Sequence, residues 1–83
     1  MSAFYVSLSS IEDVRQFVNA ATCCPCEVDV LSGRYVVDGK SIMGLFSLDL
    51  SQPVRVEVHG GEEEREAFRR SVAAFTANPP QEA

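Results

Sequence analysis

The sequence predicts an α+β domain in which one sheet is covered by helices on one face and exposed to water on the other. Segments in which apolar and polar residues alternate indicate strands with one buried face. Segments in which apolar residues recur every three or four positions indicate amphipathic helices. These two patterns are interleaved along a chain of 83 residues. Because one-sided strands are typical of antiparallel or mixed sheets, we expect an open-faced sandwich with the order strand, helix, strand, strand, helix, strand, helix.

The first third of the chain predicts one short strand and one helix. Residues 4–8 alternate between apolar and polar side chains, which indicates a half-buried strand. A helix starts after Ser9, because a serine three residues before Glu12 can form a capping box. It ends near Thr22, because Pro25 disfavours helical backbone in the residue before it. The helix residues expected to face the core are Ile11, Val14, Phe17, Val18 and Ala21.

The middle of the chain predicts a hairpin and then a short helix. Alternation returns over residues 27–31, and a Ser-Gly pair at 32–33 supplies a turn before the next strand at 35–37. Residues 41–48 form a compact apolar segment that begins with a serine suited to the N-cap position. We expect a short helix there, although Gly44 weakens it by ~1 kcal/mol relative to alanine.

The last third predicts the clearest strand and a final helix. Residues 54–59 place three valines on one face and three polar side chains on the other. The next helix follows a Gly-Gly pair, and the three glutamates of its first turn, at 62–64, favour the helix dipole rather than a metal. Its expected inward residues are Ala67, Phe68, Ser71, Val72 and Phe75. The domain is expected to span residues 1–77, and residues 78–83 form a polar tail expected to be disordered.

Composition limits the classes of function. Seven Lys and Arg against twelve Asp and Glu give a net charge of −5. This acidity argues against direct binding of nucleic acid or of an anionic membrane surface. The amino terminus lacks the basic start and apolar stretch of a secretory signal, and no apolar run approaches the ~20 residues of a spanning helix. We therefore expect a cytoplasmic protein without a membrane partner.

Residues 38–50 read Asp-Gly-Lys-Ser-Ile-Met-Gly-Leu-Phe-Ser-Leu-Asp-Leu. This string resembles the regulatory-serine region of HPr, the small phosphocarrier of the bacterial phosphoenolpyruvate:sugar phosphotransferase system, and the element order is similar from about Ala3 to Thr76. The resemblance implies a four-stranded antiparallel sheet with three helices on one face, in a bacterial protein that is not an enzyme and needs no cofactor. In Gram-positive members the serine matching Ser41 is phosphorylated by a dedicated kinase. The phosphoserine form then acts as corepressor with a catabolite-control transcription factor.

The sequence departs from that family between the first strand and the first helix. Members that carry phosphate have Gly-x-His-Ala-Arg-Pro-Ala there, whereas residues 8–14 read Leu-Ser-Ser-Ile-Glu-Asp-Val. Phosphoryl transfer through a side-chain nitrogen needs an imidazole and a cation, and Glu12 and Asp13 would repel the phosphate. We therefore expect that phosphohistidine carriage is lost and that Ser41 is retained for regulation of sugar transport and carbon metabolism.

Ser41 and its neighbours have a structural and a functional interpretation. Ser41 is either an ordinary N-cap or a phosphorylated N-cap, and the two are compatible because a phosphate there meets free backbone N–H groups. Arg34 or Lys40 could add a charge partner. A helix this short cannot bury all of its apolar residues. The resemblance implies that Leu45 and Leu48 face the core. It also implies a partner-binding face for an HPr-type kinase or a transcriptional regulator, made of Lys40, Ile42, Met43 and Phe46.

Two alternatives remain open. In the first, the scaffold is an interaction module without phosphorylation that self-associates weakly through Ile42, Met43 and Phe46, so the protein is a monomer or a weak dimer. In the second, Cys23, Cys24 and Cys26 hold a metal or react as thiols. Three cysteines are too few for a four-ligand zinc site, and a helix C-terminus does not lower a thiol pKa. We therefore expect no metal site, and Cys24 to be buried as an apolar residue.

The single histidine of the sequence, His59, ends the polar face of the last strand. No recognisable nucleophile or acid pair lies beside it in the pattern, so it is expected to be a solvated surface residue. The sequence therefore predicts no catalytic residue. Glu66 is expected to meet Arg69 and Arg70 one turn later on the last helix.

Overall fold

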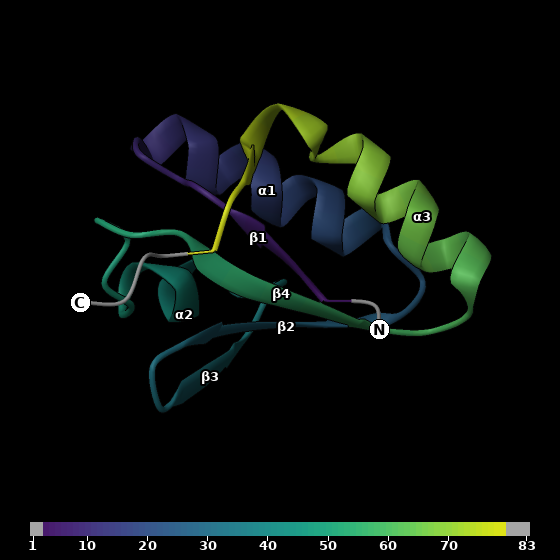
Figure 1. Cartoon of the computed structure of the whole chain (residues 1–83), viewed down its shortest axis with the longest axis horizontal. Coiled ribbons are helices and arrows are strands. Elements are labelled where there is room, and N and C mark those ends of the chain that lie inside the picture. Colours follow the sequence, from purple (N-terminus) through teal and green to yellow (C-terminus); the bar gives the residue numbers. More distant parts are fainter. Residues whose placement is uncertain (1–2, 80–83) are drawn as a thin grey trace.

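One antiparallel sheet organises the protein, as seen in a computed structural model that describes residues 3–79 (Figure 1). The strands are β1 (Phe4–Val6), β2 (Glu27–Ser32), β3 (Tyr35–Asp38), β4 (Val54–His59) and β5 (Thr76–Ala77). The helices are α1 (Ile11–Cys23), α2 (Ile42–Phe46), α3 (Glu62–Ser71) and the short 3₁₀ helix η1 (Ala73–Phe75). The α+β class, the element order and the one-sided covering by helices are thereby confirmed.

The sheet has five strands in the order β3-β2-β4-β1-β5, so the expectation of four strands was wrong. The added strand is β5, in which Thr76 pairs with Val6 and Ala77 with Tyr5. Just before it, the Ser7 amide donates to the Phe75 carbonyl at 2.8 Å. A two-residue strand has no alternation to detect, and it forms because the outer edge of β1 offers unpaired backbone groups.

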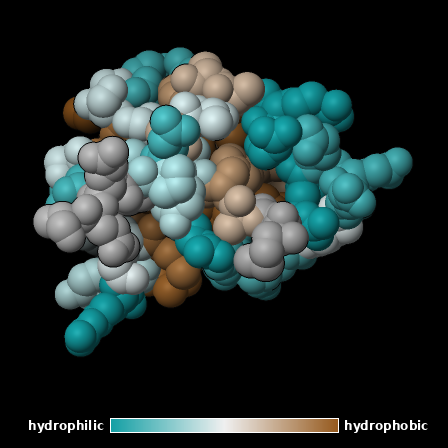
Figure 2. Space-filling view, in the orientation of Figure 1, coloured by the Kyte–Doolittle hydropathy of each residue, from teal (hydrophilic) through white to brown (hydrophobic). Residues whose placement is uncertain are grey.

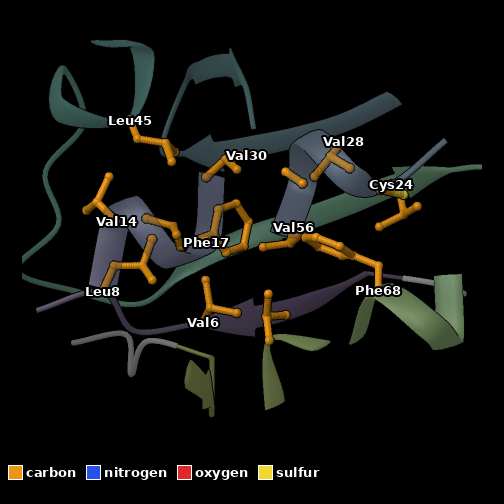
Figure 3. Packing of buried hydrophobic residues seen from close by; sticks show 14 of the residues in the cluster. Val6, Leu8, Val14, Phe17, Cys24, Val28, Val30, Leu45, Val56 and Phe68 are labelled. Atoms are coloured by element: carbon orange, nitrogen blue, oxygen red, sulfur yellow. The ribbon is translucent and has the colours of Figure 1, made fainter. Parts of the chain in front are cut away.

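The core lies between the valine face of the sheet and the helices α1 and α3, which run side by side over it (Figure 1). Figure 3 shows the Phe17 ring pointing from α1 towards Val30 and Val56. Phe68 reaches the same core from α3, and its ring meets that of Phe17 edge to face with centroids 5.6 Å apart. Such aromatic pairs add about 0.5–1.5 kcal/mol to the effect of burial alone. Helix α2 adds Leu45, which is fully buried.

Three helix residues expected in the core lie outside it. Ile11 is 68% exposed because it is the first residue of α1 and projects past the sheet. Ala67 and Ser71 are also exposed, because they lie one turn apart on the flank of α3 that lines an open groove between α3 and α1. The apolar stripe is instead continued by buried Val72 and, through η1, by half-buried Phe75.

The surface of the described residues agrees with the acidic composition. Figure 2 shows hydrophilic side chains over the end of the molecule where α3 begins. Between Ala3 and Pro79, no helix is long and apolar enough to cross a membrane. Of the expected tail, Asn78 and Pro79 are exposed and lack regular structure. Residues 80–83 lie outside the described part of the chain, so the disorder of the tail stays a prediction.

Gly60 creates a close contact between the end of β4 and the start of β2. A Cβ atom at Gly60 would overlap the Cys26 sulfur and lie 2.9 Å from the Cys26 Cβ. We expect Gly60→Ala to lower the free energy of unfolding by about 1–3 kcal/mol, because the Cys26 side chain must move. Adding Cys26→Ala should recover part of this loss, since it removes the sulfur but not the Cβ. Urea denaturation measures both changes.

The matched control for this prediction is the next glycine. A Cβ at Gly61 would lie 2.6 Å from the Glu64 Oε1 atom, which ends a flexible side chain and can swing away. Gly61→Ala should therefore change stability much less than Gly60→Ala. Equal losses for the two variants would contradict the role given to Cys26.

Candidate functional site

Ser41 caps the amino terminus of α2. Its Oγ accepts a hydrogen bond from the Gly44 amide at 3.1 Å. Its carbonyl accepts from the Leu45 amide at 3.1 Å, and its own amide donates to the Asp38 carbonyl at 2.9 Å. The N-cap expected at this position is therefore present. Ser41 is half-buried, and its backbone is fixed on both sides.

The turn before Ser41 is pinned to the sheet. The Asp38 Oδ1 atom accepts from the Lys40 amide at 2.9 Å, which closes the turn with a side chain. The Gly39 amide donates to the Val28 carbonyl at 2.7 Å. A Cβ at Gly39 would lie 2.8 Å from a Val28 methyl carbon, so a glycine is needed for this approach. Strand β2 thus sets the position of Ser41.

Gly44 has a packing role that its low helix propensity conceals. A Cβ there would lie 3.2 Å from the Val37 Cβ and 3.3 Å from the Ser41 Oγ. Both distances are tighter than ordinary van der Waals contact. The glycine lets α2 lie against β3 while Ser41 keeps its cap. Its low helix propensity makes α2 less stable, but a larger residue would not fit at this position.

The apolar residues of α2 divide between core and solvent. Leu45 and Leu48 are buried, as the resemblance implied, whereas Met43 is 76% exposed and Phe46 is 45% exposed. Ile42 differs from the expected exposed position: it is half-buried and packs against the core. The reason is helix geometry, since residues three apart share a face and Ile42 lies on the face of Leu45.

Lys40 points away from the exposed side of α2. Its Nζ donates to the Cys24 carbonyl at 3.0 Å, in a partly buried position. This carbonyl belongs to the C-cap residue that follows α1, where backbone acceptors lack helical partners. Lys40 therefore connects the serine segment to α1. The other expected charge partner, Arg34, is exposed in the turn between β2 and β3.

The start of α1 is capped by Ser10 rather than by the expected Ser9. The Ser10 Oγ accepts from the Asp13 amide at 3.1 Å. The Asp13 carboxylate accepts from the Ser9 amide at 3.0 Å and from the Ser9 hydroxyl at 3.1 Å. These bonds, above all the one from the Ser9 amide, lower the pKa of Asp13. Glu12, the expected partner, instead accepts from the Gln16 amide group at 3.3 Å.

A hollow of about 330 Å³ lies where the start of α1 meets the end of α2. Its lining comes from residues 8–14 and from the segment that ends α2 and follows it: Leu8, Ser9, Ser10, Ile11, Val14, Phe46, Leu50 and Ser51. Of the residues expected to bind partners, the hollow contains Phe46. The other lining residues were not identified from the sequence, because the two segments are more than thirty residues apart and no motif connects them.

The cysteines lie at the other end of α1. Cys23 is exposed, Cys24 is buried as expected, and Cys26 is half-buried. Desolvation raises the pKa of the Cys26 thiol, which disfavours the reactive thiolate. Cys23 and Cys24 line an open groove of about 730 Å³ between α1 and α3. Within residues 3–79, no three His, Cys, Asp or Glu side chains are grouped so that they could hold a metal ion.

The remaining charged residues belong to the sheet face and to α3. His59 is on the exposed face, and its Nε2 lies 2.8 Å from the Asp29 Oδ2. This partner follows from the pairing of β2 with β4, which the sequence did not reveal. On α3, Arg69 Nη2 lies 3.0 Å from Glu66 Oε2, as expected, whereas Arg70, the second expected partner of Glu66, is exposed.

Comparison with known proteins gives one family and one fold. The family model described as the PTS HPr component phosphorylation site matches residues 13–77. No curated protein matches the chain. The crystal structure of HPr-C-His from Thermoanaerobacter tengcongensis is similar with a TM-score of 0.74 and 22% sequence identity, over 89% of each chain. A sequence identity of 22% supports a shared fold but says nothing of a shared function.

The Asp13 carboxylate predicts a pH dependence of stability. Its pKa is lowered in the folded state, so its contribution is present above the unfolded pKa of ~3.9 and is lost as pH falls through the folded pKa. Asp13→Asn should therefore destabilise the protein at pH 7 more than at about pH 2, as measured by urea denaturation. Glu12→Gln is the control, because it removes one negative charge from the same turn. Equal losses at both pH values for Asp13→Asn would contradict the prediction.

Proposed function

The chain belongs to the HPr family of the phosphotransferase system, whose members are phosphocarriers that act with other proteins, and we propose that this member is regulatory and does not carry phosphate. The observation that carries the proposal is the pairing of a capped Ser41 with exposed apolar residues on the same short helix, in a chain without the histidine motif of carriers. Loss of carriage and use of Ser41 are two separate steps of the proposal.

Loss of carriage is supported by the chemistry at the start of α1. Ser9 and Ser10 occupy this segment, and the Asp13 carboxylate is hydrogen-bonded to Ser9. A phosphoryl group here would meet negative charge where a carrier needs an imidazole nucleophile. His59 is at the end of β4 and is paired with Asp29, so it does not replace the missing imidazole.

Use of Ser41 is supported by its position. A phosphoserine adds about −1.5 to −2 charges and three strong acceptor oxygens. These oxygens can accept from the Gly44 amide that the hydroxyl oxygen already binds. Met43 and Phe46 are exposed on the same helix, so a partner that recognises the phosphate also meets apolar surface. The proposed partners are an HPr-type kinase and a transcriptional regulator. Lys40, through its bond to the Cys24 carbonyl, and Ile42, through its packing on the core, hold α2 in place for this contact.

A second candidate is an interaction module that uses the same surface without phosphorylation. The exposure of Met43 and Phe46 favours it, because large apolar side chains exposed together are typical of protein contacts. The two candidates differ in whether Ser41 is modified and in the partner, which for the unmodified module can be a second copy of the chain.

Loss of carriage predicts that enzyme I and phosphoenolpyruvate leave the chain unphosphorylated, as measured by intact-mass spectrometry. An ordinary HPr with its histidine, in the same reaction, should gain one phosphoryl group and shows that the reaction works. A phosphoryl group on this chain that disappears in His59→Ala would identify a new phosphohistidine and reject this part of the proposal.

Modification of Ser41 predicts that an HPr-type kinase with ATP adds one phosphoryl group, which peptide mass spectrometry locates at Ser41. Ser41→Ala also removes the cap, at a cost of about 1 kcal/mol. Ser41→Asn is therefore the sharper variant, because asparagine can cap the helix but has no hydroxyl group. Ser47→Ala should be modified like the natural sequence. Absence of phosphate on Ser41 would favour the unmodified interaction module.

A further inference from the structure

The outer edge of β3 lacks the protection that sheet edges usually have. β3 is an outer strand of the sheet, and Figure 1 shows it along the border of the molecule. Tyr35 is 72% exposed and Val36 is 58% exposed. Sheets commonly shield such edges with Pro, Lys, a bulge or a very short strand. The opposite edge is shielded, because β5 has two residues and Pro79 follows closely. β3 has four residues in regular register and contains neither Pro nor Lys, so its edge is open to another strand.

The hairpin determines which backbone groups of β3 point outwards. Ser32 pairs with Tyr35 across a two-residue turn, in which Gly33 has a φ of 60°. The pair that closes such a hairpin is hydrogen-bonded, and the hydrogen-bonding direction then alternates along the strand. The N–H and C=O groups of Val36 therefore point away from β2, at the centre of the open edge.

The segment of residues 34–38 is complementary to its own antiparallel copy. It reads Arg-Tyr-Val-Val-Asp. Antiparallel pairing centred on Val36 places the two Val36 residues opposite each other. It also places Tyr35 opposite Val37 and Arg34 opposite Asp38, and twofold symmetry makes each of these pairs occur twice. Apolar side chains thus meet apolar side chains, and each exposed cation meets an exposed carboxylate.

The two faces of the sheet also match in this register. Val37 pairs with the buried Val30, so Val37 and Tyr35 belong to the core face of the sheet. Val36 pairs with Leu31 on the open face. Centring the pairing on Val36 keeps the core faces of the two copies on the same side, so both helix layers lie on one side of a continuous sheet.

We propose that β3 is an interface at which two copies of this chain pair edge to edge, in antiparallel register centred on Val36. The charge pattern favours a second copy as the occupant, because the copy presents Asp38 to Arg34 and Arg34 to Asp38 by symmetry alone. Asp38 can serve both its own turn and the second copy. Its Oδ1 atom accepts from the Lys40 amide, which leaves Oδ2 for the guanidinium.

The dimer formed in this way is weak. A four-residue strand buries less surface than the standard interface of about 1,600 Å², and the net charge of −5 on each copy opposes association. The paired edge itself is electrically balanced, because Arg34 and Asp38 cancel within each copy. The interface is separate from Met43 and Phe46, so it goes beyond the proposed function and does not rest on it.

The test follows self-association of the ¹⁵N-labelled full chain from about 10 µM to about 1 mM by NMR and by sedimentation equilibrium. The amide signals of residues 34–38 should shift with concentration, and the average mass should rise towards that of a dimer. Absence of any concentration dependence in both measurements would overturn the proposal.

Val36→Lys places two cations opposite each other at the centre of the interface. It should raise the dissociation constant of the dimer at least about tenfold. Val36→Thr is the matched control, because threonine keeps the β-branched shape and should change the constant much less. Met43→Glu locates the alternative surface on α2. Loss of association in Met43→Glu but not in Val36→Lys would assign the dimer to α2 and overturn the proposal.

A charge exchange tests the register. Arg34→Glu sets like charges opposite each other and should weaken self-association about tenfold, whereas Arg70→Glu makes the same change of net charge on an exposed part of α3 and should not. Unlabelled Asp38→Arg should restore the shifts of labelled Arg34→Glu, because opposite charges meet at both ends of the mixed dimer. Equal effects of Arg34→Glu and Arg70→Glu would overturn the proposal. Failure of a well-folded Asp38→Arg chain to restore the shifts would reject the register.

Discussion

The packing of Phe17 against the valines of β2 and β4 is the interaction on which the rest of the structure depends. The ring is fully buried, and it fixes α1 over the two central strands while Phe68 brings α3 to the same point. Once α1 is fixed, its first turn places Ser10 and Ile11 beyond the sheet. Its last residues place the Cys24 carbonyl where Lys40 can reach it. The positions of the start of α1 and of the segment around Lys40 therefore both depend on the packing of one aromatic side chain.

The elements with a strong period could be predicted from the sequence, and those set by tertiary contacts could not. Alternation located β4, and the apolar spacing located α1, because local pattern and burial agree in both. Strand β5 is two residues long and exists only because β1 has a free edge. The capping serine was misassigned because Ser9 and Ser10 each precede an acidic residue by three positions, and only the backbone shows that Ser10 is the cap and that the Asp13 carboxylate reaches back to Ser9.

The candidate site also has features that the sequence predicts and features that only tertiary contacts determine. The cap at Ser41 followed from a serine at the start of an apolar segment, and the exposure of Met43 followed from the resemblance to the HPr family. The partial burial of Ile42 could not be predicted from the sequence, because it depends on how α2 packs on β3. The close approach of Gly44 to Val37 allows this packing. The hollow joins residues from two distant segments, and only the fold brings them together.

The hydrogen bond from Lys40 to the Cys24 carbonyl joins the serine segment and the end of α1 into one cooperative unit. A five-residue helix has no independent stability in water. Opening of α2 must release this bond, so its amides are expected to exchange with solvent together with the end of α1 rather than by local fraying. Substitutions around the cysteines, at the far end of α1, are therefore expected to change how readily the serine segment opens, although they lie away from Met43 and Phe46.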